Sequence, residues 1–169
     1  MLKPTVFFDR DGVLNIDKGH VYKISDFVWN KGAKQAIKFL NNKQYLIIVV
    51  TNQSGIAKEL YTEKDMVKLH NFMNSELNKI SAKIDDFFYS PWHPEIDNDK
   101  FYHLKDLRKP NSGMLKLAEK KWPIDKKKSF LVGDKKTDLI AANKFGIRGF
   151  LFKDENLFEF IEEILENEN

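Results

Sequence analysis

The chain of 169 residues contains no cysteine. Disulfide bonds and thiolate metal sites are therefore excluded, and cysteine usage says nothing about the redox compartment. The sequence also lacks an apolar run of the length that a bilayer-spanning helix needs. Its first residues have no long apolar segment of the kind found in signal peptides. We therefore expect a cytoplasmic protein without a membrane partner.

The chain also lacks a large excess of charge of one sign. The chain has 28 basic and 25 acidic residues, a formal net charge of +3. Such a small excess does not favour nucleic acid as a partner, and the lysine pairs and triplets between 120 and 128 are interpreted as a solvated face. The length predicts one compact domain over residues 1–169, which we expect to be a monomer.

Short runs of β-branched and aromatic residues alternate with longer amphipathic segments, which predicts an α/β fold with a mainly parallel sheet. Four apolar runs are predicted to be strands buried on both faces, and a fifth run is weaker. The strands are expected at 5–8, 45–50, 86–89, 129–132 and 149–152, and helices at 31–42, 62–82, 112–121 and 137–145. Thr62 and Asp65 resemble a capping box at a helix start. The segment 90–111 is predicted to be a long functional loop.

The first polar cluster, Asp9-Arg10-Asp11-Gly12, follows the first expected strand. Alternation along an extended chain places Asp9 and Asp11 on one side, and Gly12 allows a sharp turn. Two carboxylates so close can share a hard cation, or one can attack phosphorus while the other delivers a proton. A solvated turn explains the pair equally well when it is considered alone.

Three more clusters stand at or beyond expected strand ends, where open α/β sheets bind ligands. Thr51 to Gly55 offer a hydroxyl, amides and backbone N–H groups that suit phosphate oxygens. Arg108 and Lys109 are adjacent cations before an expected helix. Asp134 and Asp138 could complete a metal site or cap the next helix. The ordered set predicts a magnesium-dependent phosphoryl-transfer site.

These clusters are similar to the four motifs of the haloacid dehalogenase superfamily: Asp9-x-Asp11-Gly12, Thr51, Lys109 and Gly133-Asp134-x-x-x-Asp138. Within it, the chain resembles the subfamily of heptose bisphosphate phosphatases and histidinol-phosphate phosphatases. The resemblance runs from Phe7 to about Ala142. It implies a Rossmann-like three-layer sandwich with no cap domain or a minimal one. It further implies removal of the 7-phosphate from a heptose 1,7-bisphosphate during nucleotide-heptose synthesis for surface polysaccharide.

The resemblance also implies roles for individual residues. Asp9 would be the nucleophile and Asp11 the acid/base, with Thr51 and Lys109 stabilising the phosphoryl group. Mg²⁺ would be held by Asp9, Asp134 and the backbone carbonyl of Asp11, with Asp138 behind them. The substrate-binding residues would be Asp17, Lys18, Gly19, His20, Asn52, Gln53, Ser54, Arg108 and Lys135.

One feature departs from the subfamily, whose members commonly hold zinc in the loop before Arg-Lys-Pro. Here the thiolates are absent and Trp92 stands where a histidine would be a ligand. The remaining histidines, His93 and His103, are too few for a closed tetrahedral site without help from carboxylates. We therefore expect no zinc, and we expect Trp92, Phe101 and Leu107 to pack the loop instead.

Other functions remain open at this point. Histidinol phosphate or another small sugar phosphate is the main alternative substrate. A phosphatase acting on nucleic-acid 3′ ends is disfavoured because no basic groove with interleaved aromatic residues is evident. A silent binding domain is disfavoured because it need not retain all five of Asp9, Asp11, Thr51, Lys109 and Asp134.

Overall fold

The computed structural model describes residues 1–96 and 99–167. Its centre is a five-stranded parallel sheet with the strand order β3-β2-β1-β4-β5. The strands are β1 (Thr5–Phe8), β2 (Leu46–Asn52), β3 (Asp86–Ser90), β4 (Phe130–Gly133) and β5 (Arg148–Leu151). The predicted α/β sandwich with a parallel sheet is therefore confirmed.

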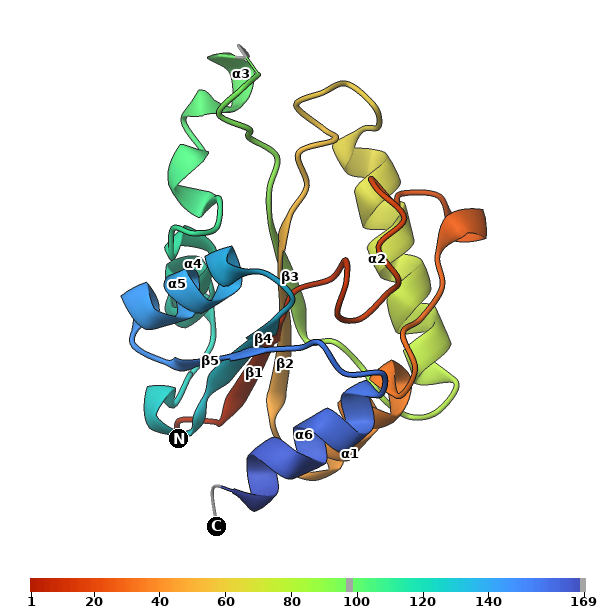
Figure 1. The fold of residues 1–169 in the computed structure, drawn as a ribbon, viewed down its shortest axis with the longest axis vertical. Helices are drawn as coiled ribbons and strands as arrows, with labels where there is room; N and C mark the ends of the chain where they lie inside the picture. The colour runs from red at the N-terminus through yellow and green to blue at the C-terminus, as the bar shows by residue number, and fades with distance from the viewer. Residues whose placement is uncertain (97–98, 168–169) are drawn as a thin grey trace.

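Helices cover both faces of this sheet and make three layers (Figure 1). One face carries α1 (Ala33–Asn42), α2 (Glu63–Asn78) and α6 (Leu157–Glu166), and the other carries α4 (Gly113–Lys121) and α5 (Lys136–Phe145). The short elements are α3 (Asp99–Tyr102) and the 3-10 turns η1 (Ile24–Asp26), η2 (Lys105–Leu107) and η3 (Lys126–Lys128). Among the described residues, no helix is long and apolar enough to cross a membrane.

Alternation along the strands explains the two apolar layers. In β1, Val6 and Phe8 join the core under α1, α2 and α6, whereas Phe7 joins the core under α4 and α5. Successive side chains of a strand point to opposite faces, so a strand covered on both sides is apolar throughout. The predicted capping box of α2 is confirmed, because the Thr62 and Asp65 side chains each bond the other's backbone N–H.

The prediction that residues 86–89 are buried on both faces is wrong. β3 is an edge strand, and its residues Asp86–Tyr89 are half-buried. An edge strand pairs on one side alone, so apolar composition does not guarantee complete cover. The helix expected over 62–82 also ends earlier, at Asn78, and a residue with positive φ follows at Ser81.

The strand order creates a crevice at the carboxyl end of the central strand. The chain leaves β1 for α1 on one face of the sheet, whereas the helices beside β4 lie on the other face. Ligands bind where the connections from neighbouring parallel strands diverge in this way. Asp9 follows β1 and Asp134 follows β4, so both residues stand at this crevice.

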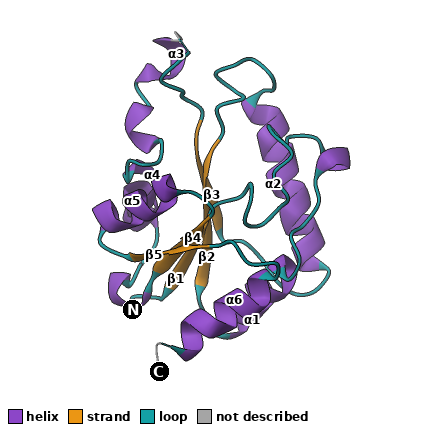
Figure 2. Ribbon diagram, in the orientation of Figure 1, coloured by secondary structure: helices purple, strands orange, loops and turns teal. Residues whose placement is uncertain are grey.

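The loop before α4 packs through aromatic side chains. A group that we call the loop cluster consists of Ile56, Ala57, Tyr61, Met66 and Phe101, with Tyr22, Tyr89, Trp92, Ile96 and Leu104 packed against it. Phe101 and Trp92 therefore pack the loop as expected. Leu107 contacts the separate core under α4 and α5. Figure 2 shows how much of this upper part of the molecule is loop.

Candidate active site

Lys109 is the centre of a buried ionic network at the carboxyl ends of β1, β2 and β4. Its Nζ lies 3.0 Å from Asp9 Oδ1 and 2.7 Å from Asp138 Oδ1, and it also donates to the Val50 carbonyl at 2.9 Å. The Lys109 side chain is 3% exposed. The side chain of Asn52 bonds both the N–H and the carbonyl of Lys109, so the backbone of this lysine is held as well. The ammonium is therefore held by three oxygens, one of which belongs to Asp9.

Burial and neighbouring charges shift the ionisation of this pair. Burial raises the pKa of Asp9 to about 7; Asp138 and Asp11 add to the increase, and Lys109 opposes it. Burial would lower the pKa of Lys109, but Asp9 and Asp138 outweigh burial and raise it. The lysine therefore stays charged, whereas the ionised form of Asp9 needs a further positive charge nearby.

The site has a donor set that fits a divalent cation. Asp9, Asp134 and Asp138 each offer a carboxylate oxygen, and these oxygens lie within 4.8 Å of one another. Asp134 Oδ1 is buried without a hydrogen-bond partner. Burial raises the pKa of Asp134; the nearby Lys135 charge opposes this increase and Asp138 adds to it. Two of the three carboxylates contact the buried Lys109 ammonium, and oxygen donors of this kind suit Mg²⁺.

Two glycines make room for these carboxylates. A Cβ atom on Gly12 would lie 2.3 Å from Asp134 Oδ2, and Gly12 also has φ of +85°. A Cβ atom on Gly133 would lie 2.2 Å from the Asp138 side chain. Because Asp138 also accepts from the Lys135 backbone N–H at 3.1 Å, it caps α5 and contacts Lys109 at once.

Asp11 is held by a second network. Arg10 Nη2 lies 3.1 and 3.0 Å from the two carboxylate oxygens, Asn15 Nδ2 donates at 3.0 Å, and Gln53 Nε2 donates at 3.1 Å. Arg10 is fully buried, and its Nη1 contacts His70 Nε2 at 3.2 Å. The pKa of His70 is lowered to about 3 by burial and by the Arg10 charge, so the neutral ring accepts this hydrogen bond. These contacts fix the direction of the Asp11 carboxylate.

A polar cavity of about 190 Å³ opens beside Asp9. It is lined by Asp9, Asp11, Asp17, Gly19, His20, Asn52, Gln53, Ser54, Tyr61, Lys109, Lys135 and Thr137. Ten of the residues expected in the site, Lys109 among them, are thus brought together there. Thr51 is buried next to Gln53, which donates to its Oγ1 at 2.8 Å.

Two of the expected substrate-binding residues do not line this cavity. Lys18 is exposed beyond it. Arg108 is half-buried and donates to the Trp92 carbonyl at 3.2 Å, and burial lowers its pKa. The family resemblance implied a substrate-binding role for Arg108, but consecutive residues of an extended segment point in opposite directions, and Lys109 is the one that enters the cavity.

Four residues were missed. Tyr61 and Thr137 line the cavity, and Arg10 and His70 support Asp11. Thr137 lies inside the Gly133 to Asp138 motif, and Arg10 lies between the two predicted aspartates, so position in a motif was an available indication. His70 lies on α2 and is buried against Phe87, with 4.2 Å between the ring centroids. Nothing local distinguishes Tyr61.

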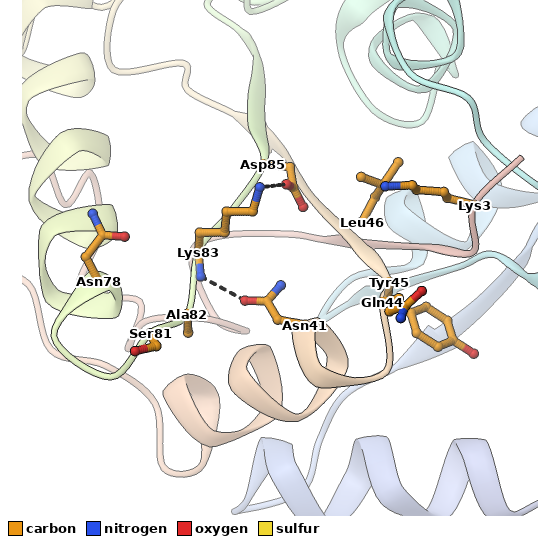
Figure 3. Close-up of a pocket in the computed structure, with 10 residues that line it drawn as sticks. All are labelled: Lys3, Asn41, Gln44, Tyr45, Leu46, Asn78, Ser81, Ala82, Lys83 and Asp85. Atoms are coloured by element: carbon orange, nitrogen blue, oxygen red, sulfur yellow. Dashed lines mark hydrogen bonds and ion pairs between the residues drawn. The ribbon is translucent and has the colours of Figure 1, made fainter. Parts of the chain in front are cut away.

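A larger hollow of about 410 Å³ lies at the amino ends of β1, β2 and β3. Figure 3 shows its residues around Lys83, which pairs with Asp85 at 2.7 Å and whose backbone N–H bonds Asn41. The second oxygen of Asp85 accepts from the Ile47 N–H. The carboxylate in this hollow is therefore neutralised by its neighbours, so the smaller cavity is the better candidate for chemistry.

Comparison with known proteins agrees with this geometry. Residues 4–148 match the family model described as polynucleotide kinase 3 phosphatase. A D-glycero-beta-D-manno-heptose-1,7-bisphosphate 7-phosphatase from Rhodopseudomonas palustris is 38% identical over 163 residues, covering 96% of this chain and 91% of that protein. The protein of the same name from Haemophilus ducreyi is 42% identical over 150 residues, covering 88% and 81%.

The fold comparison points to the same group. The crystal structure of D,D-heptose 1,7-bisphosphate phosphatase from B. bronchiseptica, complexed with magnesium and phosphate, superposes with a TM-score of 0.83. It is 26% identical, and the match covers 97% of this chain and 99% of that one. The chain therefore belongs to the haloacid dehalogenase-like phosphatases, in the family of the D-glycero-beta-D-manno-heptose-1,7-bisphosphate 7-phosphatases.

Proposed function

We propose that the protein is a magnesium-dependent phosphatase that forms a phosphoenzyme on Asp9. Its substrate is D-glycero-β-D-manno-heptose 1,7-bisphosphate, from which it removes the 7-phosphate in nucleotide-heptose synthesis. One observation carries the proposal: Asp9 lies 3.0 Å from a buried lysine and beside the unpartnered oxygen of Asp134, at the floor of a polar cavity.

The reaction follows from the positions of these groups. An oxygen of Asp9 attacks phosphorus, the bond between phosphorus and the sugar oxygen breaks, and Asp11 gives its proton to that oxygen. Asp11 then takes a proton from water, which attacks phosphorus and releases inorganic phosphate and free Asp9. Lys109 and Thr51 stabilise the charge on the equatorial oxygens.

Asp9, Asp134 and the backbone carbonyl of Asp11 would hold Mg²⁺, with Asp138 behind them. The cation supplies positive charge to the phosphoryl oxygens and to Asp9 when bound. The unpartnered Asp134 Oδ1 and the raised pKa of Asp9 both support this assignment. Asp138 is engaged by Lys109 and by the start of α5, so it positions the lysine rather than the metal.

The cavity supports a small phosphorylated sugar as the substrate. Asp17, Gly19, His20, Asn52, Gln53, Ser54 and Lys135 would contact it. Lys18 and Arg108 would meet parts of the substrate outside the cavity. We further propose that residues 1–169 act as one domain, as a monomer in the cytoplasm, and that the loop needs no zinc.

A substrate panel tests the assignment. With Mg²⁺ present, phosphate release is measured from both anomers of the heptose 1,7-bisphosphate and from histidinol phosphate. The bisphosphate should have the higher kcat/KM, and a chelator should abolish release until Mg²⁺ is restored. Faster release from histidinol phosphate would overturn the heptose assignment and leave the phosphatase chemistry standing.

A nucleic-acid 3′-phosphatase is the second candidate, because the matching family model carries that description. The near balance of charge and the small cavity argue against a strand as the substrate. Single-stranded DNA with a 3′-phosphate is the test substrate. Its hydrolysis at a rate comparable to the sugar bisphosphate, with strong competition by unphosphorylated strand, would favour this candidate.

A further inference from the structure

We propose that Tyr61 is a positioning residue for the phosphoryl-transfer step. Its hydroxyl orients the Gln53 amide, and that amide holds both the Asp11 carboxylate and the Thr51 hydroxyl. This inference rests on the proposed function, in which Asp11 supplies a proton to the leaving oxygen. Tyr61 belongs to none of the four motifs, so its contribution comes from tertiary contacts.

The contacts form a continuous chain of hydrogen bonds. Tyr61 donates its hydroxyl proton to Gln53 Oε1 at 2.5 Å. Gln53 Nε2 then donates to Thr51 Oγ1 at 2.8 Å and to Asp11 Oδ2 at 3.1 Å. Gln53 is 2% exposed and Tyr61 is 6% exposed. Water therefore has little access to replace a partner that is removed.

Tyr61 satisfies the amide oxygen of Gln53 in the one direction that also serves the acceptor-only Asp11 carboxylate. A glutamine side chain has two N–H donors and one carbonyl acceptor, and all of these groups have partners here. If the amide rotated by half a turn, its carbonyl oxygen would face the Asp11 carboxylate, and two acceptors would meet. Burial raises the pKa of Tyr61 to about 12, so the phenol keeps its proton and remains a donor.

Thr51 gains a direction from the same amide. Because Gln53 donates to Thr51 Oγ1, the hydroxyl's own proton is left for another acceptor. A phosphoryl oxygen is the acceptor that the proposed reaction offers. One amide thus prepares both a donor for the phosphoryl group and the carboxylate that serves the leaving group.

The loop cluster holds the Tyr61 ring in place. Tyr22 stacks on it with ring centroids 4.9 Å apart and an interplanar angle of 12°. A Cβ atom on Gly55 would lie 2.1 Å from Tyr61 Cε1, so glycine is needed there for the ring to approach the backbone. Phe101 joins the cluster from the loop before α4. Packing of this cysteine-free loop is therefore linked to the position of Asp11.

Tyr61→Phe removes the hydroxyl and retains the ring. The value of kcat/KM is measured for two substrates: the best alkyl phosphate of the panel, whose leaving oxygen needs a proton, and p-nitrophenyl phosphate, whose leaving group does not. For the alkyl substrate we expect a decrease of about 3- to 10-fold, the size of one hydrogen bond. The aryl substrate should lose less than the alkyl substrate. Its transfer to Asp9 needs no proton from Asp11, so only the part of the effect that passes through Thr51 remains.

Tyr89→Phe is the matched control. It removes a tyrosine hydroxyl from the same loop cluster, one that donates to Glu63 at 2.6 Å and does not reach Gln53. It should leave the ratio of the two substrates unchanged. An equal decrease for both substrates in Tyr61→Phe, no decrease, or the same altered ratio in Tyr89→Phe would overturn the proposal.

A double-mutant cycle tests whether Tyr61 acts through Gln53. Gln53→Met removes the amide, and adding Tyr61→Phe to it should change kcat/KM no further. Additive losses would overturn the route through Gln53. Asp9→Asn separates this inference from the proposed function. If the Asp9→Asn variant keeps its activity, the proposed function is wrong. Full dependence on Asp9 without an effect of Tyr61→Phe removes the positioning role alone.

Discussion

The two ends of the central sheet both open into hollows, but their charges are arranged differently. At the carboxyl ends, Asp9 and Asp138 share one buried ammonium, and Asp134 beside them has an oxygen, Oδ1, without a hydrogen-bond partner. At the amino ends, Asp85 has both Lys83 and a backbone N–H as partners (Figure 3). Lys83 is 66% exposed, so water serves that pair as well.

The comparison shows that volume is a poor guide to function here. The hollow with the matched charges is the larger one, at about 410 Å³ against about 190 Å³. Uncompensated buried charge costs free energy, and a protein retains it where a ligand or a reaction uses it. The smaller cavity holds that surplus. Four substitutions test whether the contrast is real.

The largest expected effect comes from Asp9→Asn. An amide is a far weaker nucleophile than a carboxylate, so phosphate release should fall by about 10⁴-fold or more. Asp85→Asn at the other end of the sheet is the matched control and should retain parental activity. Release measured with a coupled phosphate assay decides the matter. Comparable rates in the parent and Asp9→Asn would remove the nucleophile from the proposal.

Lys109→Met should reduce kcat by about 10²- to 10³-fold, because one preorganised cation at the phosphoryl group is lost. It should also destabilise the fold by about 3–5 kcal/mol, since Asp9 and Asp138 lose their buried partner. Lys83→Met should cost less than Lys109→Met: Lys83 is 66% exposed, and Asp85, although its side chain is 4% exposed, keeps the Ile47 N–H as a partner. Denaturant unfolding of both variants gives the comparison; equal losses would show that the two ends do not differ.

Gly12→Ala should weaken the binding of Mg²⁺, so that half-maximal activity needs a higher Mg²⁺ concentration. It should also lower the free energy of unfolding by about 1–3 kcal/mol. The positive φ is strained for alanine, and the methyl group would displace Asp134. Gly146→Ala is the control, because Gly146 has φ of +89° and open space around its missing Cβ. Activity titrated with Mg²⁺ should shift in Gly12→Ala alone. A matching shift in Gly146→Ala would contradict the role given to Asp134.

The smallest effect at neutral pH is expected from His70. Its pKa is about 3 in the fold against an ordinary 6.5, because of burial and then Arg10. Below pH 6.5 the unfolded chain binds a proton at His70 that the folded chain does not bind. The stability that the neutral ring contributes is therefore complete above pH 6.5 and is lost as the pH falls towards about 3. The free energy of unfolding should lose up to about 1.4 kcal/mol per pH unit in that window.

His70→Gln should remove that slope, whereas His103→Gln at an exposed position should retain it. Urea unfolding between pH 7 and pH 4 measures the difference between the two variants. Parallel pH dependence in His70→Gln and the parent would mean that the network around Asp11 accepts a second positive charge. The site at the carboxyl ends of the strands would then tolerate added charge as well as the hollow at their amino ends.

Much of this contrast could be predicted from local patterns. Asp9, Thr51 and Asp134 directly follow apolar strands, and parallel strands bring such positions to one edge. The sequence could not show that β3 lies at the sheet edge, because its apolar composition resembles that of the buried strands. It also could not show that Arg108 bonds the Trp92 carbonyl and does not line the cavity, since a side chain's partners depend on how the loop before α4 folds.

By itself, the sequence determined the alternation of strands and helices and the motif residues that gather at the strand ends. The physical reason is that both depend on short-range periodicity and on the parallel direction of neighbouring strands. Tertiary structure alone decided the contacts of Arg10 with His70, 60 residues apart, and of Tyr61 with Gln53. The first contact depends on how distant segments pack, and the second on how the loop between Gln53 and Tyr61 folds back, and neither follows from the periodicity of a strand or helix.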